Sequence, residues 1–313
     1  MQLRPLGKTG LQVSEIGFGA WQLGNRTDWD AMDDRTAFDL VDEALGAGIT
    51  LFDTAPNYSA GRSERLLGQA LEGRRKDVVL VSKFGRPPEG PVDFSADRFR
   101  PRLEASLERL RTDYLDVLLL HNPDPAVYEG ADPIWDALEA ARRDGLVRHY
   151  GASLDLAHEI EAILTNTGST VLEILFNILH QDVRRAFPRV GERGAGPIVK
   201  VPLDSGWLSG RYDASSRFEG VRGRWTPADI ARRAELISQL DWLTDDGSGL
   251  TEKAMAYVLS YDEVSCVIPG IRSREHLRRD LGTAGRRLSP AERARLEAFW
   301  DEFTENGSRL LPW

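Results

Sequence analysis

Residues 49–71, ITLFDTAPNYSAGRSERLLGQAL, contain one complete strand–loop–helix unit. The first part is mainly apolar up to Asp53, and Tyr58 follows five positions later. Leucine and alanine at three- and four-residue spacing then predict an amphipathic helix over residues 63–73. The stretch therefore predicts a buried strand with a polar end, followed by a loop and a helix that covers the strand.

The same unit recurs along the chain. Eight short apolar runs alternate with helical patterns: SEIGFGA (14–20), ITLFDTA (49–55), VVLVSKF (78–84), YLDVLLLH (114–121), VRHYGAS (147–153), LEILFN (172–177), PIVKVPL (197–203) and VSCVIPG (264–270). The clearest helical patterns cover residues 34–48, 63–73, 95–112 and 132–145. Near-continuous apolar strands predict a parallel sheet covered by helices, and eight units predict an α/β fold, the closed (β/α)8 barrel.

Three regions depart from the repeated unit. Residues 1–14 predict a β-hairpin that turns at GKTG and plugs one end of the barrel. Residues 204–248, after the seventh strand, are too long for an ordinary loop and include a helical pattern at 226–240. Residues 288–302 predict an extra C-terminal helix with Ser289 as its N-cap. Because no Pro- or Ser-rich linker divides the chain, we expect residues 1–313 to form a single domain.

Composition excludes several classes of function. The chain has 313 residues, of which 41% are hydrophobic and 28% charged, as in globular proteins with a large core. A formal net charge of -9 argues against general binding to nucleic acid or to an anionic membrane. The single cysteine, Cys266, lies in an apolar run and is interpreted as an inert core thiol, typical of a reducing compartment. With no signal-peptide pattern and no long apolar stretch, the protein is expected to be cytoplasmic.

Polar residues mark the ends of three consecutive strands. Asp53, Lys83 and His121 end the second, third and fourth apolar runs, and Tyr58 lies in the loop after the second. Each residue alone has an ordinary structural explanation, as a loop cap, a surface lysine or a core histidine. In a barrel, however, neighbouring strands end on the same face, so the four side chains are expected to converge there.

These residue types suit the protonation of a carbonyl oxygen. A tyrosine has an ordinary pKa near 10, and a neighbouring lysine ammonium is expected to lower it by stabilising the phenolate. An aspartate keeps the lysine charged and oriented, and a neutral histidine positions the substrate oxygen. The group therefore predicts a general-acid site for a carbonyl whose carbon receives a hydride.

The chain resembles the aldo-keto reductase superfamily, in its bacterial branch, almost from end to end. The blocks that carry the resemblance are GFGAWQLG (17–24), FDTAPNYSAGRSERLLGQAL (52–71), VLVSKFG (79–85), DYLDVLLLHNPDP (113–125), PLDSGWLSGRY (202–212) and VIPGIRS (267–273). The resemblance implies an oxidoreductase that binds NADPH or NADH without a Rossmann domain. It also implies Tyr58 as proton donor, Lys83 and Asp53 as the groups that tune it, and His121 as the group that orients the carbonyl. GFGAWQLG is not a dinucleotide loop, because bulky Trp21 stands where a phosphate needs room.

The positions that correspond to the nicotinamide site are unusual. Relatives hold the carboxamide with a Ser-Asn pair and a glutamine, whereas this chain has Ser153, Leu154 and Glu173. Leu154 has no hydrogen-bonding group, and an ionised Glu173 only accepts. Weaker or displaced nicotinamide binding is therefore expected. Lys200 stands where many relatives carry a stacking tyrosine and some carry a basic residue.

The resemblance places the phosphate groups of the cofactor at two later segments. The first is the loop after the seventh strand, with Pro202, Leu203, Gly206 and Arg211. The second is the start of a helix capped by Ser273, with Gly270, Arg272, His276, Arg279 and Asp280. Arg272 matches a residue that binds the 2′-phosphate in bacterial relatives, so NADP(H) is favoured over NAD(H). Solvated surface charges remain an alternative interpretation of Lys200 and Arg211.

The expected substrate is a small carbonyl compound. Trp21, Asn122 and Trp207 are candidate pocket residues, suited to sugars, aromatic aldehydes or natural-product ketones. Trp313 is compatible with a place over the pocket and equally with a frayed terminus. No metal ligands are assigned, and the surface pattern does not determine the oligomeric state.

Two other functions fit parts of the sequence. A reductase-like scaffold that binds nucleotide without turnover would explain Leu154 and Glu173. A barrel aldolase that forms a Schiff base on Lys83 would also use Asp53 and Tyr58.

Overall fold

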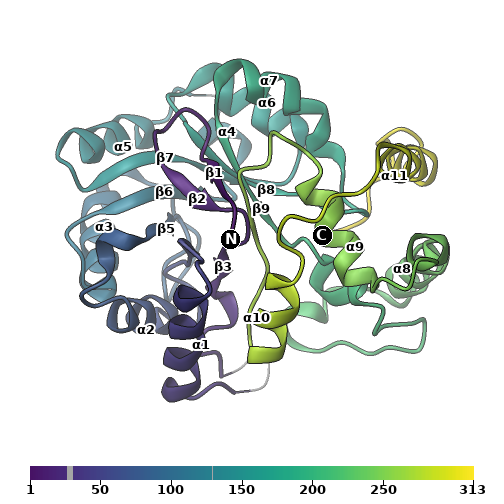
Figure 1. The fold of residues 1–313 in the computed structure, drawn as a ribbon. Helices are drawn as coiled ribbons and strands as arrows, with labels where there is room; N and C mark the ends of the chain where they lie inside the picture. The colour runs from purple at the N-terminus through teal and green to yellow at the C-terminus, as the bar shows by residue number, and fades with distance from the viewer. Residues whose placement is uncertain (27–30, 129) are drawn as a thin grey trace.

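The eight apolar runs form eight parallel strands that make up a barrel (Figure 1). The computed structural model describes residues 1–26, 31–128 and 130–313. The barrel strands are β3 (Phe18–Gly19), β4 (Leu51–Asp53), β5 (Val79–Phe84), β6 (Leu115–His121), β7 (Val147–Leu154), β8 (Val171–Leu175), β9 (Gly196–Lys200) and β10 (Cys266–Ile268). All eight predicted strands are thus confirmed, with ends that differ by a few residues.

The two edges of the sheet meet and nearly close the barrel. Each strand from β3 to β10 pairs with its neighbour in chain order. Parallel bridges then join Ile16 to Val267 and Gly19 to Gly270, which connects the first strand region to the last. Closure brings the C-terminal ends of all eight strands to one face, where the polar strand-end residues were expected to meet.

The N-terminal hairpin is also confirmed. Strands β1 (Leu3–Pro5) and β2 (Gln12–Ser14) pair antiparallel, and residues 6–11 form the turn between them. Leu6 and Val13 are fully buried and pack against inward-facing barrel residues, including Val117, Ile198 and Cys266. The hairpin is therefore the predicted plug, and Cys266 is a buried core thiol.

Helices surround the barrel and cover its outer face (Figure 1). They are α1 (Asp34–Gly46), α2 (Arg62–Ala70), α3 (Ala96–Leu110), α4 (Pro125–Tyr128), α5 (Ile134–Arg143), α6 (Ala157–Asn166), α7 (Phe187–Arg193), α9 (Leu250–Leu259) and α10 (Arg274–Leu281). Leucine-rich stripes on these helices enter the main core between helices and strands. The start of α10 is capped as predicted, since Ser273 Oγ accepts a hydrogen bond from the His276 backbone N–H.

The two additional segments form the expected helices, α8 (Pro227–Ser238) and α11 (Pro290–Phe303). Both begin with a capping box, built by Thr226 with Asp229 and by Ser289 with Glu292. A buried ion pair between Arg233 of α8 and Asp204, with 3.1 Å between Nε and Oδ2, fixes the segment after β9. Arg233 also donates to the backbone carbonyl of Pro312, which holds the C-terminus against the same segment.

Candidate active site

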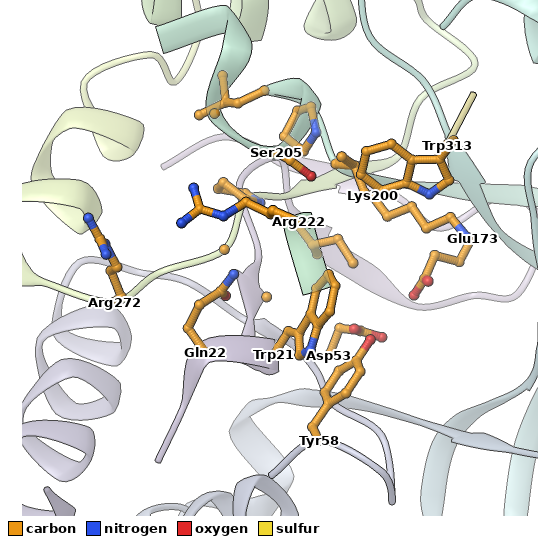
Figure 2. Close-up of a pocket in the computed structure, with 18 of the residues that line it drawn as sticks. Trp21, Gln22, Asp53, Tyr58, Glu173, Lys200, Ser205, Arg222, Arg272 and Trp313 are labelled. Carbon is orange, nitrogen blue, oxygen red and sulfur yellow. The ribbon is translucent and has the colours of Figure 1, made fainter. Parts of the chain in front are cut away.

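The C-terminal ends of the strands surround a cavity of about 550 Å³. Asp53, His121 and Lys200 are the last residues of β4, β6 and β9, and all three line it. The loop after β9 and the segment that follows it supply the opposite wall. Figure 2 shows Asp53, Tyr58 and Glu173 gathered at one side of the cavity and Arg272 at the other.

Lys83 is the centre of the buried polar cluster beneath the cavity. Its Nζ donates to both carboxylate oxygens of Asp53, at 2.6 and 2.7 Å, and to the Thr54 carbonyl at 3.1 Å. The same atom lies 3.1 Å from Glu173 Oε2 and 3.4 Å from the Tyr58 hydroxyl. Burial alone would lower the pKa of Lys83, but attraction to Asp53 and Glu173 outweighs it and raises the pKa above 10.5. The ammonium therefore keeps its charge.

The pKa of Tyr58 differs from the prediction made from the sequence. Burial raises the pKa of the phenol above 10, and the nearby Asp53 and Glu173 raise it further, although Lys83 lowers it. The expectation of a lowered pKa is therefore wrong for this cavity, because a buried phenolate loses its hydration and faces two carboxyl groups. Tyr58 keeps its proton throughout the neutral pH range.

His121 stands beside this phenol as a neutral imidazole. The ring centroids of His121 and Tyr58 are 5.9 Å apart, with the rings edge to face. Burial, together with Lys83, Lys200 and Arg86, lowers the pKa of His121 well below 6.5. The buried Nδ1 has no hydrogen-bond partner among the residues that the structure describes.

Two carboxyl groups share the charge of Lys83. Burial and the adjacent Glu173 raise the pKa of Asp53 well above 3.8. Burial would also raise the pKa of Glu173, but Lys83 and Lys200 lower it below 4.5. Lys83 Nζ contacts both carboxyl groups, so the protonation of either one affects the other through the same ammonium.

A second polar network occupies the unusual nicotinamide positions. Lys200 Nζ donates to Ser153 Oγ at 2.8 Å and to Asn122 Oδ1 at 3.2 Å, and pairs with Asp155 at 2.8 Å. Ser153 Oγ in turn donates to Glu173 Oε1 at 2.8 Å. Lys200 thus places a hydrogen-bond donor beside Ser153. Neither Leu154 nor an ionised Glu173 can provide such a donor.

The other end of the cavity is basic. Arg211, Arg272 and Arg279 line it together with His276. Burial lowers the pKa of His276 to about 4, and the three arginines reinforce this shift. At neutral pH the positive charge of this end therefore comes from the arginines alone. The other lining residues that the resemblance assigned to the cofactor are Pro202, Leu203, Gly206 and Gly270.

Four of the predicted site residues do not line the cavity. Lys83 and Ser153 lie behind the surface and contact it through their neighbours. Asp280 is fully buried against Arg279, and burial raises its pKa to about 6. Trp207 is a correction, because it is fully buried and packs against Trp225 in a separate aromatic cluster. It stabilises the segment after β9 instead of lining the pocket.

Several lining residues were missed by the sequence analysis. They are Gln22, Asn57, Arg86, Asp155, Ser205, Tyr212, Arg222 and Arg224. Arg86 lies two residues after the end of β5, so the rule that found Lys83 could also have found it. Arg222 and Arg224 belong to an irregular segment whose path no periodic pattern predicts. Trp313 lines the cavity, so the C-terminus lies over the pocket.

Comparison with known proteins agrees with this geometry. The profile of the Aldo/keto reductase family matches residues 15–301. The chain belongs to this family. As an aldo/keto reductase it is an oxidoreductase of that family, and its barrel matches the fold of solved relatives.

Three relatives illustrate the range of similarity to this aldo/keto reductase. L-galactose dehydrogenase of Arabidopsis thaliana is 32% identical over 288 residues, which cover 87% of this chain and 85% of that protein. A probable voltage-gated potassium channel subunit beta of Arabidopsis thaliana is 30% identical, with 90% of each chain covered. The structure of aldo-keto reductase AKR11C1 from Bacillus halodurans (holo form) superposes with a TM-score of 0.81 at 28% identity, over 96% of both chains.

Across the three described segments of this aldo/keto reductase, no helix combines the length and apolar character that crossing a membrane requires.

The histidine environments give a direct test of the site. We expect the imidazoles of His121 and His276 to stay neutral at about pH 6, since a lowered pKa delays proton uptake to lower pH. NMR titration of the ring nitrogens, assigned with His121→Asn and His276→Asn, measures this. In the urea-unfolded chain the pKa values of the same histidines should be about 6.5. A charged ring at either position at pH 6 in the folded protein would contradict the described environment.

Proposed function

We propose that this protein reduces an aldehyde or ketone with a hydride from NADPH or NADH. The observation that supports this most strongly is the contact of the Tyr58 hydroxyl, which lies at the cavity, with the buried Lys83, itself held by Asp53. In this proposal the carbonyl oxygen lies between Tyr58 and His121. The four residues then have the roles that the family resemblance implies.

Tyr58 delivers the proton. Its raised pKa keeps the phenol protonated before the reaction, so an acid is available at the start of each cycle. As the carbonyl oxygen gains negative charge, the proton moves to it from the Tyr58 hydroxyl. The Lys83 ammonium, 3.4 Å from this hydroxyl, stabilises the phenolate that is left.

His121 orients the same oxygen. Because the imidazole is neutral, one of its nitrogens carries a hydrogen that can be donated to the carbonyl. A charged imidazolium would compete with Tyr58 as the acid, and burial together with the neighbouring cations prevents it from forming.

The cavity suits a nicotinamide dinucleotide, which supplies the hydride when bound. Arg211, Arg272 and Arg279 offer positive charge for its phosphates at one end. At the other end, the Lys200 ammonium lines the cavity on the side proposed for the carboxamide group, with Ser153 behind it. Gln22, which lines the cavity between them, has a buried Oε1 with no partner among the described residues.

The structure argues against a Schiff-base aldolase. A lysine nucleophile must lose its proton, but Asp53 and Glu173 raise the pKa of Lys83 and occupy its ammonium group. The scaffold alternative has support from the relative named as a potassium channel subunit beta. A scaffold differs from a reductase in one measurable respect, since it binds nucleotide but does not consume it.

Replacing the proposed acid tests the function. Tyr58→Phe should lower kcat by about a hundredfold or more with a panel of aldehydes, because it removes the proton donor and leaves the ring. Consumption of reduced nucleotide, followed by absorbance, measures kcat. Tyr114→Phe is the control, since Tyr114 stacks between Arg75 and Arg148, outside the cavity. Full activity of Tyr58→Phe would refute the proposal, and a wild type without turnover would favour the scaffold.

The unusual carboxylate at Glu173 gives a second test. Glu173→Gln should tighten NADPH binding about three- to tenfold, because a neutral amide can donate to the carboxamide oxygen. The affinity for NADP⁺ should increase less, because its positively charged nicotinamide ring no longer has the attraction of the carboxylate. Fluorescence titration gives both dissociation constants, with Glu235→Gln on the surface of α8 as control. Unchanged NADPH affinity would show that Glu173 does not affect the nicotinamide.

The basic end of the cavity should select the coenzyme. We propose that NADPH is preferred over NADH because Arg272 binds the 2′-phosphate. Arg272→Ala should then lower kcat/KM for NADPH about tenfold or more, as expected on losing a charge-assisted hydrogen bond, and change kcat/KM for NADH little. Arg274→Ala is a matched control, because Arg274 pairs with Asp39 and Glu43 and does not line the cavity. Equal wild-type efficiencies with both coenzymes would contradict this preference.

A further inference from the structure

Three cationic side chains surround His121 at the carbonyl end of the cavity: Lys83, Lys200 and Arg86. Two of them have carboxylate partners. Lys83 pairs with Asp53 and Glu173, and Lys200 pairs with Asp155 at 2.8 Å. These pairs leave the lysines with little net charge to offer a ligand.

Arg86 differs from both lysines. Its Nε donates to the backbone carbonyl of His121 at 3.1 Å, which fixes the guanidinium beside the proposed carbonyl site. It lines the cavity, and within the described part of the chain no carboxylate forms an ion pair with it. The remaining N–H groups of Arg86 are therefore available to a ligand, and they carry the net positive charge of this end.

The backbone around Arg86 is built to hold this position. Gly85 has a φ of +107°, and a side chain there would overlap the Phe94 ring, so the chain turns sharply directly after β5. The Gly85 carbonyl accepts a hydrogen bond from the Asp93 backbone N–H at 2.8 Å, which closes the loop. Arg86 is thus fixed at the cavity wall by both its backbone and its side chain.

Asn57 adds an unpartnered hydrogen-bond acceptor to the same cavity, which suits a donor group of a ligand and not its carboxylate. Asn57, which precedes Tyr58, also lines the cavity, and its buried Oδ1 has no hydrogen-bond partner within the described segments. A buried amide oxygen without a partner costs free energy unless a ligand or water donates to it. Trp21 and Tyr58, with ring centroids 5.9 Å apart and nearly parallel, supply the apolar surface beside it.

Arg86 lies away from the basic end that suits the cofactor phosphates. It follows β5, whereas Arg272 and Arg279 follow β10, and strands β3 and β4 separate β5 from β10 around the barrel. A phosphate held by Arg272 and Arg279 therefore does not account for the charge of Arg86.

We propose that Arg86 binds the substrate, and that the physiological substrate is a carbonyl compound with a carboxylate group. The planar guanidinium pairs with this carboxylate while the carbonyl oxygen lies between Tyr58 and His121. This inference rests on the proposed reductase function and names its substrate class. It also makes Arg86 a determinant of specificity that acts by direct contact with substrate.

Matched pairs of aldehydes test the proposal. Wild-type protein should reduce 3- or 4-carboxybenzaldehyde with a kcat/KM about tenfold above that of the corresponding formylbenzamide, a neutral compound of the same shape, mainly through KM. Arg86→Gln should bring the ratio of the two kcat/KM values close to one, and Arg86→Lys should retain part of it. Arg98→Gln, a change at an exposed arginine of α3, should keep the wild-type ratio.

Two results would overturn the inference while leaving the reductase function intact. One is equal wild-type kcat/KM for the charged and neutral aldehydes. The other is an equal loss of kcat/KM with both aldehydes in Arg86→Gln, which would mean that Arg86 only positions His121.

If no aldehyde is reduced at all, the reductase function fails. Calorimetric binding of benzoate against benzamide to wild type and Arg86→Gln then decides the anion site separately, because a preference for benzoate that depends on Arg86 supports it and its absence refutes it.

Discussion

The buried charge of Lys83 is the constraint on which the candidate site depends. An isolated ammonium in a protein interior loses several kcal/mol of hydration, and removing one partner of a buried pair costs about 3–5 kcal/mol. Lys83 avoids this cost through contacts with Asp53 and Glu173 at 2.6–3.1 Å. The same contacts fix the position of Tyr58, the phenol nearest to the ammonium. Stability of the barrel interior and the proposed proton transfer therefore involve the same group of side chains.

The cavity divides into two electrostatic regions. At the carbonyl end, each lysine is paired with carboxylates: Lys83 with Asp53 and Glu173, and Lys200 with Asp155. At the other end, Arg211, Arg272 and Arg279 line the wall. A dinucleotide with phosphates at one end and a nicotinamide at the other suits this division. Arg86 is the exception at the carbonyl end, which is why its charge is informative.

The fold could be predicted because it depends on local patterns that recur. Continuous apolar runs between amphipathic segments allow few arrangements other than a parallel sheet covered by helices, and the count of eight indicates closure. The strand-end rule by itself predicts Asp53, Lys83 and His121 on one face of the barrel. Capping patterns at Ser273 and Ser289 were also reliable, since a cap depends only on residues a few positions apart.

The failures have a different physical origin. The sequence analysis gave Trp207 a place in the pocket, but the segment after β9 folds on itself and buries the ring with Trp225. It also predicted an acidic Tyr58, because one neighbouring ammonium was considered without the burial and the two carboxyl groups that oppose it. Glu173 was recognised as unusual, but its contact with Lys83 was not foreseen, since two strands, β6 and β7, separate β5 from β8 in the sheet.

The sequence by itself determined the barrel, its plug, its additional helices and the four side chains of the proposed acid site. All of these follow from spacing along the chain, which sets the direction of each side chain relative to its strand or helix. Only the tertiary structure decided which charges neutralise one another, which aromatic rings face the cavity, and that Arg86 beside His121 has no carboxylate partner among the described residues. These properties depend on distances between residues far apart in the chain, and on the water that folding removes from around them.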